Sequence, residues 1–340
     1  MSDEPIHQGK KTLTMVTCPA CQTKVFIPSD LAPLTTTTCS SCGGRIMMPM
    51  HLRQFELRAV IGSGGMGKVY RAWDTVLHRM VAVKLMKAEL AQEPKSLDNF
   101  YREARAAASL NHTNIGHIYN YDELDGRRYL VMELADQGSL DSLIEKHRLL
   151  NELKVLDIGI KISSALDMAL KHNLLHRDLK PGNILFNLDH EPKLVDFGLA
   201  RDVDAEDDPN EGIWGTPYYV APEKVKHEKE TFLSDMYSLG GTLYHALTGH
   251  VPFEAPKVED VLSAHVYTPL TPPNQVEPEI TQPTSDALMK VMAKNPADRY
   301  LSYDEFIMAL ESARSRLLVA RTTAPTSEPP SHSKTSWWRR

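Results

Sequence analysis

Apolar residues first recur at strand-like spacing in the stretch that begins near Phe55. The stretch from Val60 to Tyr70 predicts two β-strands around a glycine-rich turn. The apolar run Met80–Lys84 predicts another strand, and Tyr129–Glu133 predicts a further one. These residues are therefore expected to form a small lobe that is rich in β-strands.

Helical spacing follows further along the chain. Pro94 and Ser96 open a predicted helix that runs to about Leu110, with Ser96 as its expected N-terminal cap. Apolar residues recur at helical spacing over residues 153–172, and a helical region is expected from about residue 138 onward. The pattern predicts an α+β fold in which the β-rich lobe precedes a larger α-helical lobe.

The two ends of the chain lack such periodicity. Residues 1–14 are polar and are expected to be disordered. Residues 317–340 are rich in Pro, Ser and Thr, which is typical of a disordered tail. The tail ends in Trp-Trp-Arg-Arg at residues 337–340, and we interpret it as a simple tail, with contact to a membrane surface as the alternative.

The composition is that of a globular protein. Of the 340 residues, 42% are hydrophobic and 24% are charged, so the chain can bury a sizeable core. The net charge of −6 and the lack of a long basic run argue against a protein that coats nucleic acid. No apolar run approaches the roughly 20 residues of a membrane-spanning helix, and the N-terminus lacks a secretion signal. The expected compartment is the cytoplasm.

All four cysteines lie near the N-terminus, in two C-x2-C pairs, Cys18/Cys21 and Cys39/Cys42. Such pairs are typical of a structural zinc site, because each forms a knuckle and four thiolates complete a tetrahedron around Zn²⁺. Disulfides or a redox-active pair are the alternatives, and disulfides fit poorly with a cytosolic protein. Residues 15–49 resemble the small zinc ribbons at the N-termini of bacterial proteins, and so small a module needs its metal to fold.

The strongest chemical signal lies in the segment HRDLKPGN, which begins at His176, and in DFG, which begins at Asp196. Phosphoryl transfer from a nucleoside triphosphate needs a carboxylate to orient the attacking hydroxyl, a cation beside the transferred group and oxygen ligands for magnesium. Asp178 and Lys180 are the candidates for the first two roles, and Asn183 and Asp196 for the metal. Both segments match protein-kinase signatures at every specified position.

Residues 52–316 resemble the bacterial eukaryotic-like (Hanks-type) serine/threonine protein kinases. Besides the two signatures above, Gly62, Gly64, Gly67 and Val69 fit the glycine-rich loop G-x-G-x-x-G-x-V of that family. A dinucleotide-binding Rossmann turn shares the glycine spacing, but its helix should begin at the third glycine. Here the residues after Gly67 continue as a strand, which favours the kinase loop.

The resemblance implies a bilobal protein-kinase fold with an N-lobe over residues 52–134 and a C-lobe over residues 135–316. It also implies ATP and Mg²⁺ (or Mn²⁺) as cofactors. Lys84 is expected on the α- and β-phosphates, with Glu103 as its partner on a helix. The expected ATP-binding residues are Ile61, Gly62, Ser63, Gly64, Gly65, Met66, Gly67, Lys68, Val69, Ala82, Lys84, Met132, Glu133, Leu134 and Leu185.

Other residues are expected to support the site. They are Arg177, Thr216, Glu223, Asp235 and Arg299. By resemblance, Glu223 pairs with Arg299, Asp235 anchors the backbone of the catalytic loop, and Thr216 bonds near the catalytic residues. His176 follows two leucines, and we interpret it as a packed structural residue and not as a base.

The segment between Gly198 and Gly215 contains no Ser, Thr or Tyr. It carries acids instead, at Asp202, Asp204, Glu206, Asp207, Asp208 and Glu211. In the family that the chain resembles, an arginine in the position of Arg177 normally pairs with a phosphate on this loop. One hypothesis is that a loop carboxylate partly replaces that phosphate and supports activity without loop phosphorylation. A solvated acidic loop is the equally weighted alternative.

The sequence thus predicts an ATP- and Mg²⁺-dependent protein serine/threonine kinase in bacterial signalling, able to autophosphorylate, with a structural Zn²⁺ ribbon. The main alternative is a pseudokinase scaffold that binds nucleotide without turnover, and the complete catalytic set argues against it. A small-molecule kinase of the same fold is a third hypothesis. Proteins with Ser or Thr acceptors are the expected partners. A homodimer and protein docking by the ribbon are further hypotheses, and nucleic acid is disfavoured because few basic residues flank the cysteines.

Overall fold

The computed structural model describes residues 13–18, 20–28, 31–197, 201–202 and 217–323. The chain divides into two compact units, residues 1–143 with 165–208 and residues 144–164 with 209–340. Within the described residues, the first unit holds the strands and the second is helical. The predicted α+β fold, with its β-rich part ahead of its helical part, is confirmed.

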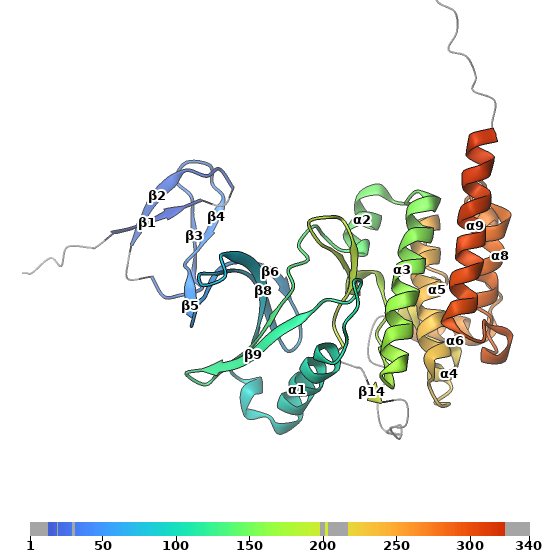
Figure 1. Ribbon diagram of the computed structural model, residues 1–340, viewed down its shortest axis with the longest axis horizontal. Helices are drawn as coiled ribbons and strands as arrows, with labels where there is room; N and C mark the ends of the chain where they lie inside the picture. Colours follow the sequence, from blue (N-terminus) through green and yellow to red (C-terminus); the bar gives the residue numbers. More distant parts are fainter. Residues whose placement is uncertain (1–12, 19, 29–30, 198–200, 203–216, 324–340) are drawn as a thin grey trace, which may run out of the picture. The chain divides into compact units, whose positions relative to one another are not determined.

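An antiparallel six-stranded sheet forms the centre of the first unit (Figure 1). Its strands, in spatial order, are β5 (Met50–Leu52), β6 (Phe55–Ser63), β7 (Gly67–Asp74), β8 (Arg79–Met86), β10 (Arg127–Met132) and β9 (Ile118–Leu124). The strands predicted around the glycine turn and at residues 80 and 129 are present. Strand β9 was not predicted, because its polar residues follow no clear alternation of buried and exposed positions.

Strand β8 has two buried faces. Val81 and Val83 are fully buried in an apolar cluster with residues of β5, β6, β7 and β10. Ala82 and Lys84 point to the opposite face of the sheet, because successive side chains on a strand alternate. The sheet therefore separates an apolar core from the face that carries the candidate site.

Helix α1 (Pro94–Ala108) begins at the predicted Pro94 and ends close to the predicted Leu110. Glu93 is its N-cap, and Pro94 occupies the first helical position, where the missing N–H costs no helical hydrogen bond. The expectation that Ser96 caps the helix is wrong. Ser96 lies inside the first turn, and its hydroxyl donates to the Glu93 carboxylate at 2.9 Å.

The cysteine-containing segment folds into two small antiparallel hairpins. They pair β1 (Leu13–Thr17) with β2 (Lys24–Pro28), and β3 (Thr36–Thr38) with β4 (Arg45–Met47). Val25, Ile27 and Ile46 are buried around Cys18 and Cys39. Cys18 and Cys39 lie in the core of this module, whereas Cys42 is exposed.

Two short two-stranded sheets support the HRD and DFG segments. Strand β11 (Leu174–Leu175) pairs with β14 (Arg201–Asp202), and β12 (Ile184–Phe186) pairs with β13 (Pro192–Leu194). The 3-10 helix η2 (Pro181–Asn183) lies between β11 and β12. Both signature segments are thus tied to antiparallel ladders within the first unit.

Helices make up the described part of the second unit. Helix α2 (Leu140–His147) and helix α3 (Glu152–Lys171) each contain residues of both units. The helix predicted at residues 153–172 is confirmed. The others are α4 (Pro222–Val225), α5 (Phe232–Thr248), α6 (Val258–Tyr267), α7 (Pro273–Val276), α8 (Gln282–Val291) and α9 (Tyr303–Thr323), and α8 packs against both α5 and α9 (Figure 1). None of the helices in the described residues is both long and apolar enough to cross a membrane.

Candidate active site

The loop between β11 and β12 gathers three of the predicted catalytic residues. The Asp178 carboxylate accepts hydrogen bonds from Lys180 Nζ at 2.7 Å and from Asn183 Nδ2 at 3.0 Å. Asn183 Nδ2 also donates to the Asp178 carbonyl at 2.8 Å. The carboxylate is therefore held in one orientation by an adjacent cation and an amide.

His176 connects this loop to the DFG segment. Its ring is fully buried and meets the Phe197 ring edge-on, with ring centroids 4.8 Å apart. The Asp178 N–H points at Nδ1 at 3.3 Å, so Nδ1 is the acceptor and Nε2 donates to the Val195 carbonyl at 3.1 Å. Both ring nitrogens are engaged with backbone groups, which agrees with the interpretation of His176 as a packed structural residue.

Asp196, the first residue of the DFG segment, has a strained backbone conformation. Its φ is +67°, in the left-handed region, where the Cβ of any residue other than glycine is strained. Arg177, in the HRD segment, has a similar φ of +65°. The Asp196 side chain is 47% exposed, and one carboxylate oxygen lies 3.8 Å from Lys84 Nζ on β8. The strand lysine and the DFG aspartate therefore face the same space.

The glycine-rich turn joins β6 to β7. The Gly64 N–H donates to the Gly67 carbonyl at 2.9 Å and closes the turn. A Cβ at Gly67 would lie 2.2 Å from the Leu85 carbonyl oxygen, so only glycine allows β7 to approach β8 there. A Cβ at Gly64 would meet no described atom within 4 Å, so the need for glycine at that position does not come from the fold itself.

A cavity of about 820 Å³ lies between these elements. The predicted residues that line it are Ile61, Gly62, Ser63, Gly64, Gly65, Met66, Gly67, Val69, Ala82, Lys84, Met132, Glu133, Asp178, Asn183, Leu185 and Asp196. Lys68 and Leu134 do not line it. Lys68 is an exposed strand residue beside the glycine turn, where alternation directs its side chain to the other face of the sheet from Val69.

Other lining residues were missed by the sequence analysis. They are Ala135, Asp136, Gly138, Ser139, Ser142, Gly182 and Val195. Ser139 and Ser142 exchange hydrogen bonds, because each hydroxyl accepts from the backbone N–H of the other. This reciprocal cap lies at the start of helix α2, which begins at Leu140, and the spacing of the two serines was the signal that could have revealed it.

The segment after β10 is fixed by the side chain of Glu133. Its carboxylate accepts from Lys193 Nζ at 2.6 Å and lies 3.0 Å from His117 Nδ1. Burial would raise the pKa of this carboxyl, but the Lys193 and His117 contacts outweigh it and lower the pKa. The Glu133 N–H donates to the His117 carbonyl at 2.8 Å, so Glu133 can offer a ligand its carbonyl and not its N–H.

The family model described as the protein kinase domain matches residues 55–308. The chain belongs to the protein kinase family. PknH, a serine/threonine-protein kinase of Mycobacterium tuberculosis, is 36% identical over 262 residues, which are 77% of this chain and 42% of PknH.

Two further relatives are also kinases by name. PknA, a serine/threonine-protein kinase of Mycobacterium tuberculosis, is 35% identical over 283 residues, which are 82% of this chain and 64% of PknA. A probable serine/threonine-protein kinase of Streptomyces coelicolor is 36% identical over 278 residues, which are 80% of this chain and 41% of the relative. The chain thus spans less than half the length of PknH and of the Streptomyces relative.

Some predicted site residues lie outside the described part of the chain. Helix α1 carries Glu103 in its sequence, but the side chain of Glu103 is not among those described. Thr216 and the acids at residues 204–211 also lie outside the described residues, and Asp202 is described only as a backbone position in β14. The Lys84–Glu103 pair and the role of the acidic segment therefore stay predictions.

The predicted ion pair of the second unit is present. Arg299 Nη1 and Nη2 donate to the two Glu223 oxygens at 2.7 and 2.8 Å, and both side chains are at least 97% buried. Burial would raise the pKa of Glu223, but Arg299 and the Ser234 hydroxyl lower it. Asp235 is buried in the first turn of α5, next to Ser234.

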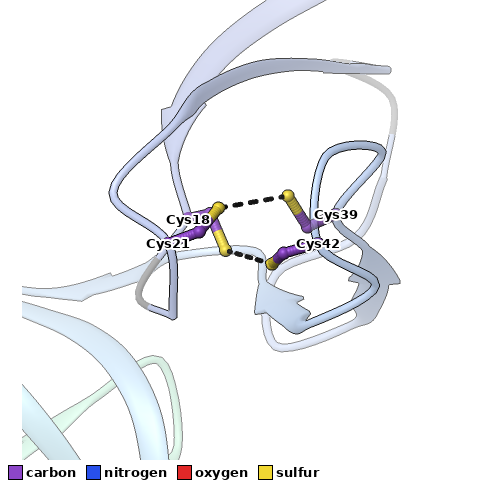
Figure 2. Close-up of side chains that lie close together, drawn as sticks. All are labelled: Cys18, Cys21, Cys39 and Cys42. Carbon is purple, nitrogen blue, oxygen red and sulfur yellow. Dashed lines mark hydrogen bonds between the residues drawn. The ribbon is translucent and has the colours of Figure 1, made fainter.

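The four cysteine sulfurs form one cluster in the ribbon (Figure 2). All four lie within 4.8 Å of one another, with Cys18–Cys42 at 3.7 Å and Cys21–Cys39 at 3.8 Å. Sulfurs at the corners of a tetrahedron with Zn–S bonds of about 2.3 Å lie about 3.8 Å apart, so the spacing fits a zinc centre. The cysteines are free, which disagrees with the disulfide alternative.

Backbone N–H groups point at two of the four sulfurs. The Gly44 N–H points at Cys42 Sγ, and the Ser41 N–H points at Cys39 Sγ, both at 3.4 Å. Thr23 lowers the pKa of the Cys21 thiol to about 6. The Gly44 N–H acts in the same direction on Cys42, but the neighbouring thiols outweigh it and raise the pKa of Cys42 to about 12. Because a thiolate is the form that binds a metal, metal binding at these cysteines would release protons.

Proposed function

We propose that this chain is a protein serine/threonine kinase that transfers the γ-phosphoryl group of ATP to Ser and Thr hydroxyls. The observation that carries the proposal is the convergence of Lys84, Asp178, Asn183 and Asp196 on one cavity beneath the glycine-rich turn. Membership of the kinase family and the printed names of its relatives support the reaction class. Because the chain covers only part of those relatives, the activity of the whole protein is a proposal.

Asp178 is the residue we assign to the acceptor hydroxyl. Its carboxylate accepts the hydroxyl proton as the oxygen attacks the γ-phosphorus and the bond to the β-phosphate oxygen breaks, releasing ADP. Lys180 stabilises the charge that develops on the transferred group, since its Nζ already lies 2.7 Å from the carboxylate. Lys84 holds the α- and β-phosphates from the strand opposite.

Asn183 and Asp196 are the residues we assign to Mg²⁺. Asn183 uses its amide nitrogen on Asp178, so its amide oxygen is the atom left to ligate a cation, and the Asp196 carboxylate is half exposed toward the cavity. Hard oxygen donors of this kind suit Mg²⁺ or Mn²⁺. When bound, the metal neutralises charge on the β- and γ-phosphate oxygens.

The four cysteines are assigned to a structural Zn²⁺. The tetrahedral spacing of the sulfurs supports this, as do the backbone N–H groups that point at two of them. A reducing compartment such as the cytoplasm would keep the thiols available for the metal. Protein substrates are the proposed partners, and the Glu223–Arg299 pair, which fixes the segment after residue 217, is the feature that favours a protein over a small molecule.

One assay separates the kinase from the pseudokinase scaffold. The purified full chain is given Mg-ATP labelled at the γ-phosphate and a generic protein acceptor, with Asp178→Asn as the control. We expect label on Ser and Thr of the acceptor or of the chain itself, and a loss of at least about 100-fold in Asp178→Asn. Nucleotide binding without any transfer of label would show the scaffold and reject the kinase.

A further inference from the structure

Strand β4 contributes to two different cores. Ile46 packs in the ribbon core with Cys18 and Cys39, and the next residue, Met47, is buried in the core of the kinase sheet with Leu57. Neighbouring residues of a strand point in opposite directions, so one short strand places one side chain in each core. The ribbon is therefore packed onto the sheet and is not a module on a flexible tether.

Further contacts fix the ribbon to the sheet. Leu34, in the loop before β3, packs against the sheet core, and its N–H donates to the Met48 carbonyl at 2.9 Å. The chain then continues directly into β5, whose Met50 pairs with Leu57 of β6. The contact thus involves both covalent continuity and buried apolar packing.

The sheet core that receives Met47 is the back wall of the candidate nucleotide site. Val81 and Val83 of β8 lie in the same apolar cluster as Met47, and both are fully buried. The residues beside them on the strand, Ala82 and Lys84, line the cavity on the other face. The apolar cluster that includes Met47 and the cavity thus lie on opposite faces of β8.

The position of Met47 depends on the cysteine cluster. Cys39 follows β3 directly, and its N–H donates to the Gly44 carbonyl at 2.7 Å, next to the start of β4. Thr36 of β3 is the register partner of Met47. A module of this size has too small a core to fold without its metal, so loss of the metal would release β3 and β4 together with Met47.

We propose that the four-cysteine site is an effector site for the nucleotide cavity. A soft divalent cation such as Zn²⁺ holds β4 in place, and Met47 and Leu34 then keep β8 in the position that presents Ala82 and Lys84 to the nucleotide. Removal of the metal loosens β8 and weakens nucleotide binding. By thermodynamic reciprocity, nucleotide binding strengthens metal binding by the same factor. The inference rests on the proposed metal site and nucleotide site, and it does not require catalysis.

The test uses the full chain, loaded with Zn²⁺ or stripped by a chelator that is then removed, in the same Mg²⁺ buffer. Hydrogen exchange at residues 81–83 and the Kd for a fluorescent ADP analogue are measured in both states. We expect faster exchange at these residues and a Kd that rises about fivefold in the stripped protein, with a matching fivefold change in zinc affinity when ADP is saturating.

A variant that keeps the metal tests the mechanical step. Met47→Ser leaves all four cysteines in place and should retain stoichiometric zinc, yet show the same faster exchange and weaker ADP binding as the stripped protein. Phe26→Ser is the matched control, because Phe26 lies on β2 of the ribbon with 68% of its surface exposed, and it should change neither quantity. The control also excludes a general effect of placing serine in the ribbon.

Three results would overturn the inference. Failure to bind zinc would remove the effector, and failure to bind ADP would remove the cavity it acts on. Metal removal that unfolds the ribbon while exchange at residues 81–83 and the ADP Kd stay unchanged would show an independent module. A chain that transfers no phosphate but still shows the coupled changes would reject the proposed kinase activity and leave this inference standing.

Discussion

The charged residues of the candidate site and those of the second unit are arranged in opposite ways. Glu223 and Arg299 form a bidentate pair at 2.7 and 2.8 Å with both side chains almost fully buried. Asp196 and Lys84 lie 3.8 Å apart, and the Asp196 side chain is 47% exposed. The first pair is closed to other partners, whereas the second faces a cavity of about 820 Å³.

The difference shows how structural and functional charges can be told apart. A buried charge must be matched by hydrogen bonds within the fold, since an unmatched one costs several kcal/mol. A charge that serves a ligand has to keep bonding capacity until the ligand arrives, so the fold gains little from it. Mutations should therefore reduce stability at the closed pair and activity at the open one.

The largest loss of stability is expected for Glu223→Gln. The substitution keeps the shape of the side chain but leaves the Arg299 guanidinium, whose side chain is fully buried, without a countercharge. Breaking a buried pair in this way costs about 3–5 kcal/mol. Chemical denaturation followed by a probe in the second unit measures the change in the free energy of unfolding.

Glu228→Gln is the matched control for that substitution. Glu228 is exposed in the same segment, so its neutralisation should change the free energy of unfolding by less than about 0.5 kcal/mol. Equal effects of the two substitutions would mean that the Glu223–Arg299 pair contributes no more than a surface charge. The contrast between closed and open pairs would then be wrong.

A smaller loss is expected for Lys193→Met in the first unit. The Lys193 side chain is 6% exposed and donates to Glu133, whose side chain is 17% exposed, at 2.6 Å. Methionine fills similar space but leaves the largely buried Glu133 carboxylate with only the His117 side chain beside it among the contacts described here, at a cost of about 2–3 kcal/mol. Hydrogen exchange of the Glu133 amide and denaturation report the loss. Lys171→Met, at a side chain that is 67% exposed, should be close to neutral.

The features that could be predicted from the sequence are those that a sequence motif marks. The strands around the glycine turn, the cysteine cluster and the Glu223–Arg299 pair are all present where the sequence predicted them. Each of these features has a local signature, such as C-x2-C spacing or a fixed order of acid, cation and amide. A motif constrains residues that are close in sequence. A distant pair such as Glu223–Arg299 could be predicted only because the family that the chain resembles has such a pair.

Tertiary packing decided the features that were not foreseen. Ala135, Asp136 and Val195 line the cavity because of where β10 and β13 end, and no periodicity marks such positions. Likewise, nothing in the sequence separates Ile46, which packs beside the cysteines, from Met47, which packs in the sheet. The packing of the ribbon onto the six-stranded sheet depends on that alternation, which becomes visible only once both cores exist.

A pH-dependent loss of stability is expected from His265 in α6. Burial, with the Lys294 ammonium nearby, lowers the pKa of His265 to about 3. An unfolded histidine has a pKa of about 6.5, so between these values the unfolded chain binds a proton that the folded chain does not. The loss therefore grows as pH falls below 6.5, and reaches about 2 kcal/mol at pH 5.

Chemical denaturation at pH 7 and at pH 5 measures this loss in the free energy of unfolding. His265→Gln should remove most of the difference between the two pH values, even if it lowers stability at both. His250→Gln is the matched control, because His250 is exposed, and the difference should persist there. A wild-type protein that is equally stable at pH 7 and pH 5 would contradict the buried, neutral state of His265.

The smallest change in stability, with the clearest loss of activity, is expected for Asp196→Asn. Asparagine keeps the shape, and it tolerates the left-handed φ of +67° at this position. The exposed carboxylate contributes little to folding, so the free energy of unfolding should change by less than about 0.5 kcal/mol. Phosphoryl transfer should fall by at least about 100-fold, because the residue assigned to Mg²⁺ loses its charge.

Asp196→Ala distinguishes loss of the carboxylate from strain of the backbone. Alanine also removes the charge, but unlike asparagine it has no side-chain oxygen to stabilise the left-handed conformation. Its free energy of unfolding should therefore be lower by about 1 kcal/mol more. Both variants should be inactive, and only alanine should be less stable. If asparagine destabilised the protein as much as Glu223→Gln does, Asp196 would belong with the structural charges. The exposure of Asp196 beside Lys84 would then not be explained by a role in binding a ligand.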